Sequence, residues 1–338
     1  MTSVLDQVLL HNVAEAERTG QGDYRLSRVP ADVRERINED AQKRAFNTCG
    51  CEIRFVMKGE EAAVLLRRAE SEAAAAYGLA EVYFGMFQGM YAETPVPVGT
   101  DTVAVTIRRP AHMDVLKRLA KEQGMAFDPE VVRVVLPYDW ECRLVGIEGN
   151  ITRPRADQLP GKTMVAYGSS ITHGGDSVQP TGTYAMRTAR RLGMDLINMG
   201  SAGSAQMDEA MAGYIAGRKD WHLATVEMGI NVIRLWEPAR FEEAVNRFLR
   251  VLADGAGERP VIVTDLFRCI HDAAGNPRAA EYRGIVQEAV QKLQSPHFSY
   301  ISGLDLLPDY AGLSVDLVHP GAAGHELIAE RLVAAVLS

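Results

Sequence analysis

Residues 164–174 have the sequence MVAYGSSITHG, in which an apolar run leads into a turn made of small residues. The apolar run predicts a buried strand, and the glycine and serines after it predict a sharp turn at the strand's carboxyl end. Such a turn exposes the hydroxyl of Ser170 and lets a substrate and backbone N–H groups approach it. Ser170 is therefore a candidate nucleophile, although an isolated serine at such a place is more often a turn residue or a helix N-cap.

Beyond this strand the chain alternates between strand-like and helical patterns. Such alternation predicts a parallel sheet covered on both faces by helices, with a ligand site beyond the carboxyl ends of the strands. The predicted strands are 163–167, 195–198, 222–228, 260–265 and 299–302, and the predicted helices lie near 182–192, 207–217, 240–254, 279–293 and 322–337. We expect residues 162–338 to form one α/β domain.

The first 152 residues have a different pattern. Short strand-like runs are separated by turn-forming pairs such as Lys58-Gly59, and one short helix is predicted at Met113–Lys121. This pattern predicts a β-sandwich domain over residues 1–152. The predicted strands are 53–57, 63–66, 82–87, 103–107, 131–136 and 142–147, and residues 30–44 could hold a short helix. The prolines between Thr152 and Gly161 indicate a linker between the two domains.

The composition restricts the possible partners. The 338 residues are 47% hydrophobic and 24% charged, with a net charge of −8 and no basic block, which argues against a nucleic-acid or anionic-membrane partner. No apolar run is long enough to cross a bilayer, and the N-terminus lacks the pattern of a signal peptide. The cysteines are few and fit free thiols of a reducing cytoplasm: Cys49, Cys51, Cys142 and Cys269.

We therefore expect a cytoplasmic protein that acts on a small molecule and needs no cofactor. No group of histidines and carboxylates has the spacing of a metal site, so no metal is predicted. The sequence leaves open whether the protein forms a homo-oligomer.

Four loops that follow predicted strands carry the residues that ester hydrolysis requires. That chemistry needs a nucleophile, a base, a group that orients the base, and donors for the tetrahedral oxyanion. His319 is the candidate base, and Asp316, three residues earlier, can accept from its Nδ1–H. The backbone N–H groups of Ser170 and Gly203 and the side-chain amide of Asn231 are candidate oxyanion donors. Each match alone has an ordinary interpretation as a cap or turn, but together they predict one catalytic site.

These residues resemble the SGNH, or GDSL-type, serine hydrolases. The four blocks of that family carry Ser in Gly-Asp-Ser-Leu, Gly after the second strand, Asn in Gly-x-Asn-Asp, and His in Asp-x-x-His. The resemblance covers about residues 162–338 and implies a flavodoxin-like three-layer α/β/α domain with a five-stranded parallel sheet. By position it implies a nucleophile, two oxyanion donors and the rest of the triad: Ser170, Gly203, Asn231, Asp316 and His319.

The chain departs from the family pattern at two positions. Ser169 and Val232 stand where the family has aspartates, which bears on loop hydrogen bonding and substrate fit and not on the reaction type. A β-rich region ahead of the catalytic domain also looks like a subset of the family with a jelly-roll-like sandwich. That subset includes carbohydrate deacetylases and at least one acyltransferase.

Further side chains near the predicted site could line a substrate pocket. These are His173, Trp236, Arg268 and His271, for several of which a solvated surface position is the alternative. His325 is expected to pack inside the last helix. We expect an esterase that cleaves a short-chain, acetyl-type ester of a carbohydrate or other small polar molecule through an acyl-enzyme on Ser170. Transfer of the acyl group to an alcohol is the nearest alternative. A carbohydrate-binding protein with an inactive hydrolase domain is the more distant one.

Overall fold

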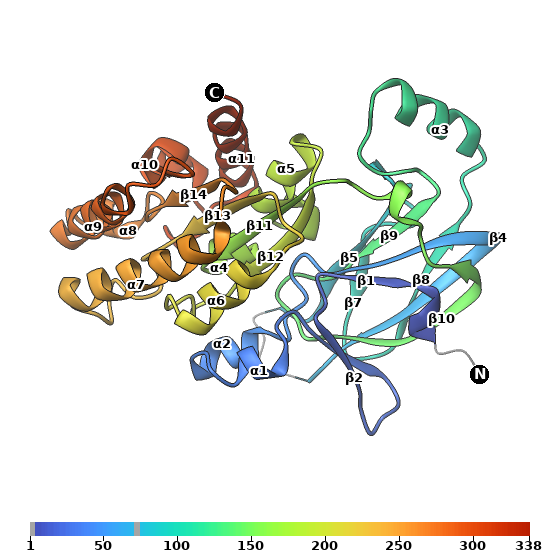
Figure 1. Ribbon diagram of the computed structural model, residues 1–338. Coiled ribbons are helices and arrows are strands. Elements are labelled where there is room, and N and C mark those ends of the chain that lie inside the picture. The colour runs from blue at the N-terminus through green and yellow to red at the C-terminus, as the bar shows by residue number, and fades with distance from the viewer. Residues whose placement is uncertain (1–3, 71–74) are drawn as a thin grey trace.

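The computed structural model describes residues 4–70 and 75–338, which form two sheets of different kinds (Figure 1). Strands β1–β10 belong to an antiparallel sheet, and strands β11–β15 belong to a parallel one. The antiparallel sheet ends at Thr152 and the parallel sheet begins at Thr163. The predicted fold class, a parallel α/β domain after an antiparallel β-rich region, is confirmed.

The parallel sheet contains five strands in the described part of the chain, in the order β12-β11-β13-β14-β15. Strand β11, which leads to Ser170, lies between β12 and β13, so its carboxyl end is flanked by the loops that follow both neighbours. The strands are β11 (Thr163–Gly168), β12 (Asp195–Gly200), β13 (Leu223–Glu227), β14 (Val261–Thr264) and β15 (Phe298–Ile301). Each overlaps a strand predicted from the sequence.

Helices cover both faces of this sheet, as alternate residues of β11 illustrate. Met164 and Ala166 point into one apolar cluster, and Val165 and Tyr167 point into another on the opposite face. The first face packs against α5 (Tyr184–Arg191), α10 (Gly303–Leu306) and α11 (Ala322–Leu337). The second packs against α6 (Glu209–Gly217), α7 (Pro238–Ala256) and α9 (Pro277–Leu293). Shorter elements are η2 (Ala156–Gln158), α4 (Ser170–His173), η3 (Pro180–Gly182), α8 (Ile270–Ala273) and η4 (Tyr310–Gly312).

The antiparallel sheet is built on one long strand, β4 (Glu52–Arg68). Its first half pairs with β1 and β9, its second half pairs with β8, and β10 pairs with parts of both halves. Side chains from both halves, such as Phe55 and Leu66, enter the same apolar core. The remaining elements are η1 (Val4–Gln7), β1 (Leu9–His11), β2 (Glu15–Arg18), β3 (Tyr24–Ser27), β5 (Gly78–Phe84), β6 (Phe87–Gln88), β7 (Val96–Val98), β8 (Val103–Arg108), α3 (Met113–Glu122), β9 (Val131–Val135) and β10 (Cys142–Thr152).

The turn predicted at Lys58-Gly59 is wrong, because β4 runs through it without a break. The register against β10 passes from Gly149 opposite Ala62 to Ile151 opposite Met57. The four residues 58–61 therefore lie opposite Asn150 alone. A bulge of this kind bends a strand without ending it, so two predicted strands are one.

Two short helices from the first part of the chain, α1 (Ala31–Arg34) and α2 (Glu39–Arg44), lie beside α6 (Figure 1). Val33, Ile37 and Ala41 are buried in the same cluster as the apolar side chains of α6 and α7. Asn38 caps α2 by accepting a hydrogen bond from the Ala41 N–H at 3.1 Å. This early segment thus packs with the parallel sheet and its helices.

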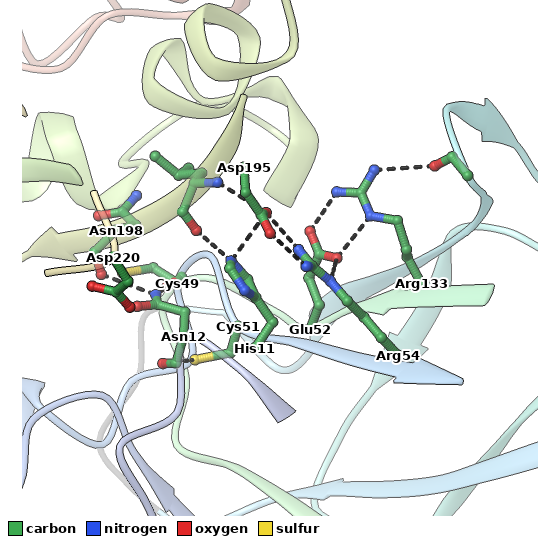
Figure 2. A network of polar contacts seen from close by, with 12 residues as sticks. His11, Asn12, Cys49, Cys51, Glu52, Arg54, Arg133, Asp195, Asn198 and Asp220 are labelled. Atoms are coloured by element: carbon green, nitrogen blue, oxygen red, sulfur yellow. Dashed lines mark hydrogen bonds and ion pairs between the residues drawn. The ribbon is translucent and has the colours of Figure 1, made fainter. Parts of the chain in front are cut away.

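A buried network of charges also joins the two sheets (Figure 2). Arg54 of β4 donates to both carboxylate oxygens of Asp195, the first residue of β12, at 2.6 and 2.7 Å. Glu52 accepts from Arg54 and Arg133. Burial alone would raise the pKa of Glu52, but the two guanidinium groups hold it well below its usual range. Each of these buried charges has an opposite partner, as burial of an ion requires.

Candidate active site

Three of the sequence-predicted residues form one hydrogen-bonded series. Helix α4 begins at Ser170, directly after β11, and Ser169 caps it by accepting from the Ile171 N–H at 3.1 Å. The Ser170 Oγ lies 2.7 Å from His319 Nε2, and His319 Nδ1 lies 2.5 Å from Asp316 Oδ2. The structure therefore brings Ser170, His319 and Asp316 together in the order hydroxyl, imidazole and carboxylate.

The loop around Asp316 holds its carboxylate in place. Asp316 Oδ1 accepts from the N–H groups of Val318 and His319 at 2.8 and 2.9 Å, and from the Ser314 hydroxyl at 2.8 Å. Partial burial works to raise the pKa of Asp316, but these bonds and the bond from His319 lower it well below the usual range. Asp316 is therefore a carboxylate that fixes the His319 ring with its N–H at Nδ1.

The predicted oxyanion donors lie in the same cleft as Ser170 and His319, which has a volume of about 510 Å³. Gly203 has a φ of +69°, a backbone conformation that favours glycine. Asn231 Oδ1 accepts from the Ala205 N–H at 3.0 Å, which fixes the orientation of the amide. Among the described residues, Asn231 Nδ2 and the N–H groups of Ser170 and Gly203 have no protein partner. These donors are available to a ligand.

The two positions that differ from the family pattern are both buried. Ser169 is the cap of α4, and its N–H donates to Glu227 Oε2 at 2.6 Å. Burial raises the pKa of Glu227, whose Oε2 also accepts from the Thr172 hydroxyl at 3.2 Å. A serine cap and a buried glutamate thus provide the hydrogen bonding of this turn. Val232 is fully buried in the apolar core.

His173 lines the cleft, but its side chain is almost fully buried. Its Nε2 lies 2.7 Å from the Tyr138 carbonyl, and its Nδ1 lies 3.0 Å from the Gly200 carbonyl. Burial lowers the pKa of His173 to about 3, so the ring is neutral near pH 7. The ring links the two parts of the chain. His271 also lines the cleft, where its Nδ1 lies 3.1 Å from Asn276 Nδ2.

Two of the predicted pocket residues do not line the cleft, and for these the prediction was wrong. Trp236 lies one helical turn after Val232, with its N–H donating to the Val232 carbonyl, and this turn directs both side chains into the core. The Arg268 guanidinium lies over the Tyr310 ring, 5.0 Å from its centroid. His325 packs as expected. It is buried, with Nδ1 accepting from the Tyr184 N–H and Nε2 donating to the Gly175 carbonyl.

Sequence reasoning missed the contribution of the first part of the chain to this cleft. Arg44 ends α2, and Tyr138 and Asp139 lie between β9 and β10, yet all three line the cleft beside Ser170. Burial raises the pKa of Asp139, whose carboxylate lies 3.6 Å from His173 Nε2. Seven further lining residues were also missed: Gly175, Asp176, Ala202, Ile230, Arg234, Ile270 and Val318. No local sequence signal could have found Arg44 or Asp139, because their place depends on how the two sheets pack.

One group of potential metal ligands overlaps this site. Ligand atoms of Asp176, Asp316 and His319 lie within 4.8 Å of one another. The Asp316 and His319 atoms are already engaged in the hydrogen bonds described above. We therefore assign no metal to this group.

A hydroxyl, an imidazole and a carboxylate in series at the carboxyl edge of a parallel α/β sheet form the arrangement that serine hydrolases use. The model of the GDSL-like lipase/acylhydrolase family matches residues 166–327. The α/β part of the chain belongs to that family, and the protein is a hydrolase that acts on ester bonds. The predicted family and enzyme class are confirmed. No helix in residues 4–70 and 75–338 is long and apolar enough to cross a membrane.

Several solved structures share the whole two-part fold. A salicylyl-acyltransferase from a tetracycline biosynthetic pathway is 18% identical, with a TM-score of 0.79 over 98% of this chain and 95% of its own. A family two carbohydrate esterase from Clostridium thermocellum is 15% identical, with a TM-score of 0.59 over 85% and 90%. An acetyl xylan esterase from the rumen bacterium Butyrivibrio proteoclasticus is 11% identical, with a TM-score of 0.57 over 99% and 96%. No curated protein sequence matches this chain.

Proposed function

We propose that this protein is a serine esterase that cleaves a short-chain ester through an acyl-enzyme on Ser170. The observation that carries the proposal is the unbroken series from Asp316 through His319 to Ser170, with bonds of 2.5 and 2.7 Å. The donors without a protein partner at Ser170, Gly203 and Asn231 lie in the same cleft. This combination supplies each group that acyl transfer needs.

The proposed reaction proceeds in two halves. His319 Nε2 takes the Ser170 proton as Oγ attacks the ester carbonyl, and the imidazolium that forms is stabilised by the Asp316 carboxylate. The Ser170 and Gly203 N–H groups and the Asn231 amide hold the tetrahedral oxyanion. His319 then gives its proton to the leaving alcohol. In the second half, His319 takes a proton from water, which attacks the acyl-enzyme and releases the acid and free Ser170.

The proposed substrate is an acetyl-type ester of a carbohydrate or other small polar molecule. The walls of the cleft support a polar alcohol part, because Arg44, Asp139 and Arg234 line it together with Ser170. Carboxylate and guanidinium groups are suited to bind hydroxyl groups of such an alcohol. Two of the similar structures are esterases of carbohydrates by name.

A second candidate function is acyl transfer to an alcohol, which would take the place of water in the second half-reaction. The similarity to the salicylyl-acyltransferase over nearly the whole of both chains favours it. A carbohydrate-binding role without catalysis is disfavoured, because Ser170, His319 and Asp316 are all present and hydrogen-bonded.

Hydrolysis of nitrophenyl acetate by the wild type, Ser170→Ala and His319→Ala tests the proposal. Each variant should lose roughly three orders of magnitude or more in kcat, as other triads do. Near wild-type activity in Ser170→Ala would contradict the mechanism. Product analysis with an added alcohol separates the two candidates, because an acyltransferase forms the new ester in competition with water and an esterase forms only the acid.

A further inference from the structure

The loop that carries Gly203 is held from outside by the first part of the chain. Three of its carbonyl groups, on alternate residues, accept hydrogen bonds from side chains of residues 28–44. These bonds run from Arg28 Nη2 to Gly200 at 3.0 Å, from Arg44 Nε to Ala202 at 3.3 Å, and from Asn38 Nδ2 to Ser204 at 3.0 Å. The proposed oxyanion loop is therefore shaped by residues that lie more than a hundred positions earlier in the sequence.

Arg28 is the most deeply buried of these donors, with 3% of its surface exposed. Its guanidinium donates to the carbonyls of Asn198 and Gly200 in β12 at 2.8 and 3.0 Å, and to the carbonyls of Asn47 and Arg44 at 2.6 and 2.8 Å. No carboxylate pairs with it in the described part of the chain. Its charge is held by carbonyl groups alone, which fits the fixed, planar fork of arginine and not the single ammonium of lysine.

Gly200, whose carbonyl accepts a hydrogen bond from Arg28, is closely packed and hydrogen-bonded on other sides as well. The Gly200 N–H donates to Asn198 Oδ1 at 2.8 Å, and the Gly200 carbonyl also lies 3.0 Å from His173 Nδ1. A Cβ on Gly200 would lie 2.3 Å from the His173 backbone nitrogen, so this strand end presses directly on α4, the helix of Ser170. Gly200 thus contacts α4, the helix of Ser170, and directly precedes the proposed oxyanion loop.

The turn that contains Gly203 begins at Ser201, one residue after Gly200. The Ser204 N–H donates to the Ser201 carbonyl at 3.1 Å, and Gly203 lies inside the turn at a φ of +69°. The Gly200 carbonyl belongs to the peptide that leads into Ser201, the first residue of the turn, and Gly203 is its third residue. Donors for an oxyanion act only when they are held in place before the charge forms.

We propose that Arg28 is a positioning residue of the oxyanion site, which acts through the Gly200 carbonyl to hold the Gly203 N–H toward the Ser170 oxyanion. This inference rests on the proposed function. The first part of the chain then positions an oxyanion donor in addition to lining the cleft.

Arg54 offers a matched control, because it is also a buried arginine that joins the two parts of the chain through β12. Arg54 binds Asp195 at the amino end of that strand, whereas Arg28 binds its carboxyl end (Figure 2 shows the Arg54 side). The test compares Arg28→Lys with Arg54→Lys on nitrophenyl acetate. Arg28→Lys should lower kcat about tenfold or more with KM nearly unchanged, because the loss falls on the transition state. Arg54→Lys should lower the melting temperature but leave kcat within about twofold.

Phenylboronic acid gives a second readout that a purely structural role would not move, because it forms a tetrahedral adduct with a serine hydroxyl. Its Kd should rise in Arg28→Lys by about the same factor by which kcat/KM falls, and should not change in Arg54→Lys. If Arg28→Lys does not fold, Asn38→Ala tests the same loop at the Ser204 carbonyl, with an expected fall in kcat of about threefold.

The inference is overturned if folded Arg28→Lys keeps kcat and the boronate Kd within about twofold of wild type, or if Arg54→Lys loses both to the same degree. It is likewise overturned if Asn38→Ala, used in its place, keeps kcat. Failure of the proposed function looks different: the wild type would then have no activity that depends on Ser170.

Discussion

His319 Nε2 lies 2.7 Å from the Ser170 Oγ, although 149 residues separate the two in the sequence. Ser170 follows β11, and His319 lies on the loop before α11. The parallel sheet places both at the same edge, where a proton can pass directly from hydroxyl to imidazole. The proposed esterase mechanism requires that Ser170 passes its proton to His319 through this contact when it attacks the ester.

Replacing Asp316 with asparagine should lower kcat for nitrophenyl acetate by roughly 10²- to 10⁴-fold, because the amide cannot both accept from His319 Nδ1–H and stabilise the imidazolium. The Oδ1 atom at this position would still accept from two backbone N–H groups, so the loop should keep its shape. Ser314→Ala is the control, since it removes only one hydrogen bond to Asp316 and should change kcat little. Equal effects in the two variants would argue against an orienting role for Asp316.

Asn231 can be tested by two substitutions that separate its two hydrogen bonds. Asn231→Asp keeps an oxygen to accept from the Ala205 N–H but replaces the donor with a negative charge. Its melting temperature should stay near that of the wild type, while kcat falls by about 10²-fold or more. Asn231→Ala should lower both quantities. An active Asn231→Asp enzyme would remove Asn231 from the oxyanion site.

Two glycines of the proposed oxyanion loop should respond differently to alanine. At Gly200 a Cβ would meet the His173 backbone at 2.3 Å, which must push β12 away from α4. At Gly203 a Cβ would meet nothing within 4 Å, and the cost is only the positive φ, roughly 1–2 kcal/mol. Thermal unfolding should therefore show a larger loss for Gly200→Ala. The opposite order would mean that the contact between β12 and α4 is not tight.

The sequence predicts the α/β part well because its signals are local. Each strand of the parallel sheet is a short apolar run, and each helix has a clear period. Ser170, Gly203 and Asn231 come soon after strands, and His319 comes just before the last helix. Ser170, Gly203, Asn231 and His319 could therefore be placed in one cleft without any long-range information.

The features that could not be predicted depend on contacts between distant segments. The bulge at residues 58–61 exists only because β10 lies opposite, and Trp236 turns inward because the turn after Asn231 is helical. Arg44 and Asp139 reach the cleft because the two sheets pack together through buried charges. No periodicity or motif in the sequence reports such packing.

His325 should make the stability of the fold dependent on pH. Burial lowers the pKa of His325 to about 4 from its ordinary 6.5, and its Nδ1 must be unprotonated to accept from the Tyr184 N–H. Below pH 6.5 His325 binds a proton in the unfolded chain but not in the folded chain. The free energy of unfolding is therefore highest above pH 6.5 and decreases as the pH falls toward 4. The loss should approach about 3 kcal/mol.

Urea unfolding of the wild type and His325→Asn at several pH values measures this effect. Asparagine retains an acceptor for the Tyr184 N–H but does not titrate, and the other buried histidines are common to both proteins. The wild type should lose stability relative to the variant between pH 6.5 and pH 4. A difference that does not vary with pH would show that His325 titrates normally.

Asp139 should affect the choice of alcohol and not the chemical step. Its carboxylate lines the cleft from the first part of the chain, where it can accept hydrogen bonds from substrate hydroxyls. Asp139→Asn should raise KM for acetylated sugars about fivefold to tenfold and leave kcat/KM for nitrophenyl acetate, which has no hydroxyls, nearly unchanged. Kinetics on a panel of acetylated sugars provide the measurement. Equal losses on both kinds of ester would place Asp139 in a structural role.

The most direct test of the central claim is covalent labelling by a nitrophenyl phosphonate, followed by peptide mass spectrometry. The phosphonate reacts with an activated serine and forms a stable tetrahedral adduct that resembles the transition state. The proposed mechanism predicts one adduct per chain, on Ser170, with much slower labelling in His319→Ala and none at that position in Ser170→Ala. Labelling at another residue, or equally fast labelling in Ser170→Ala, would contradict it.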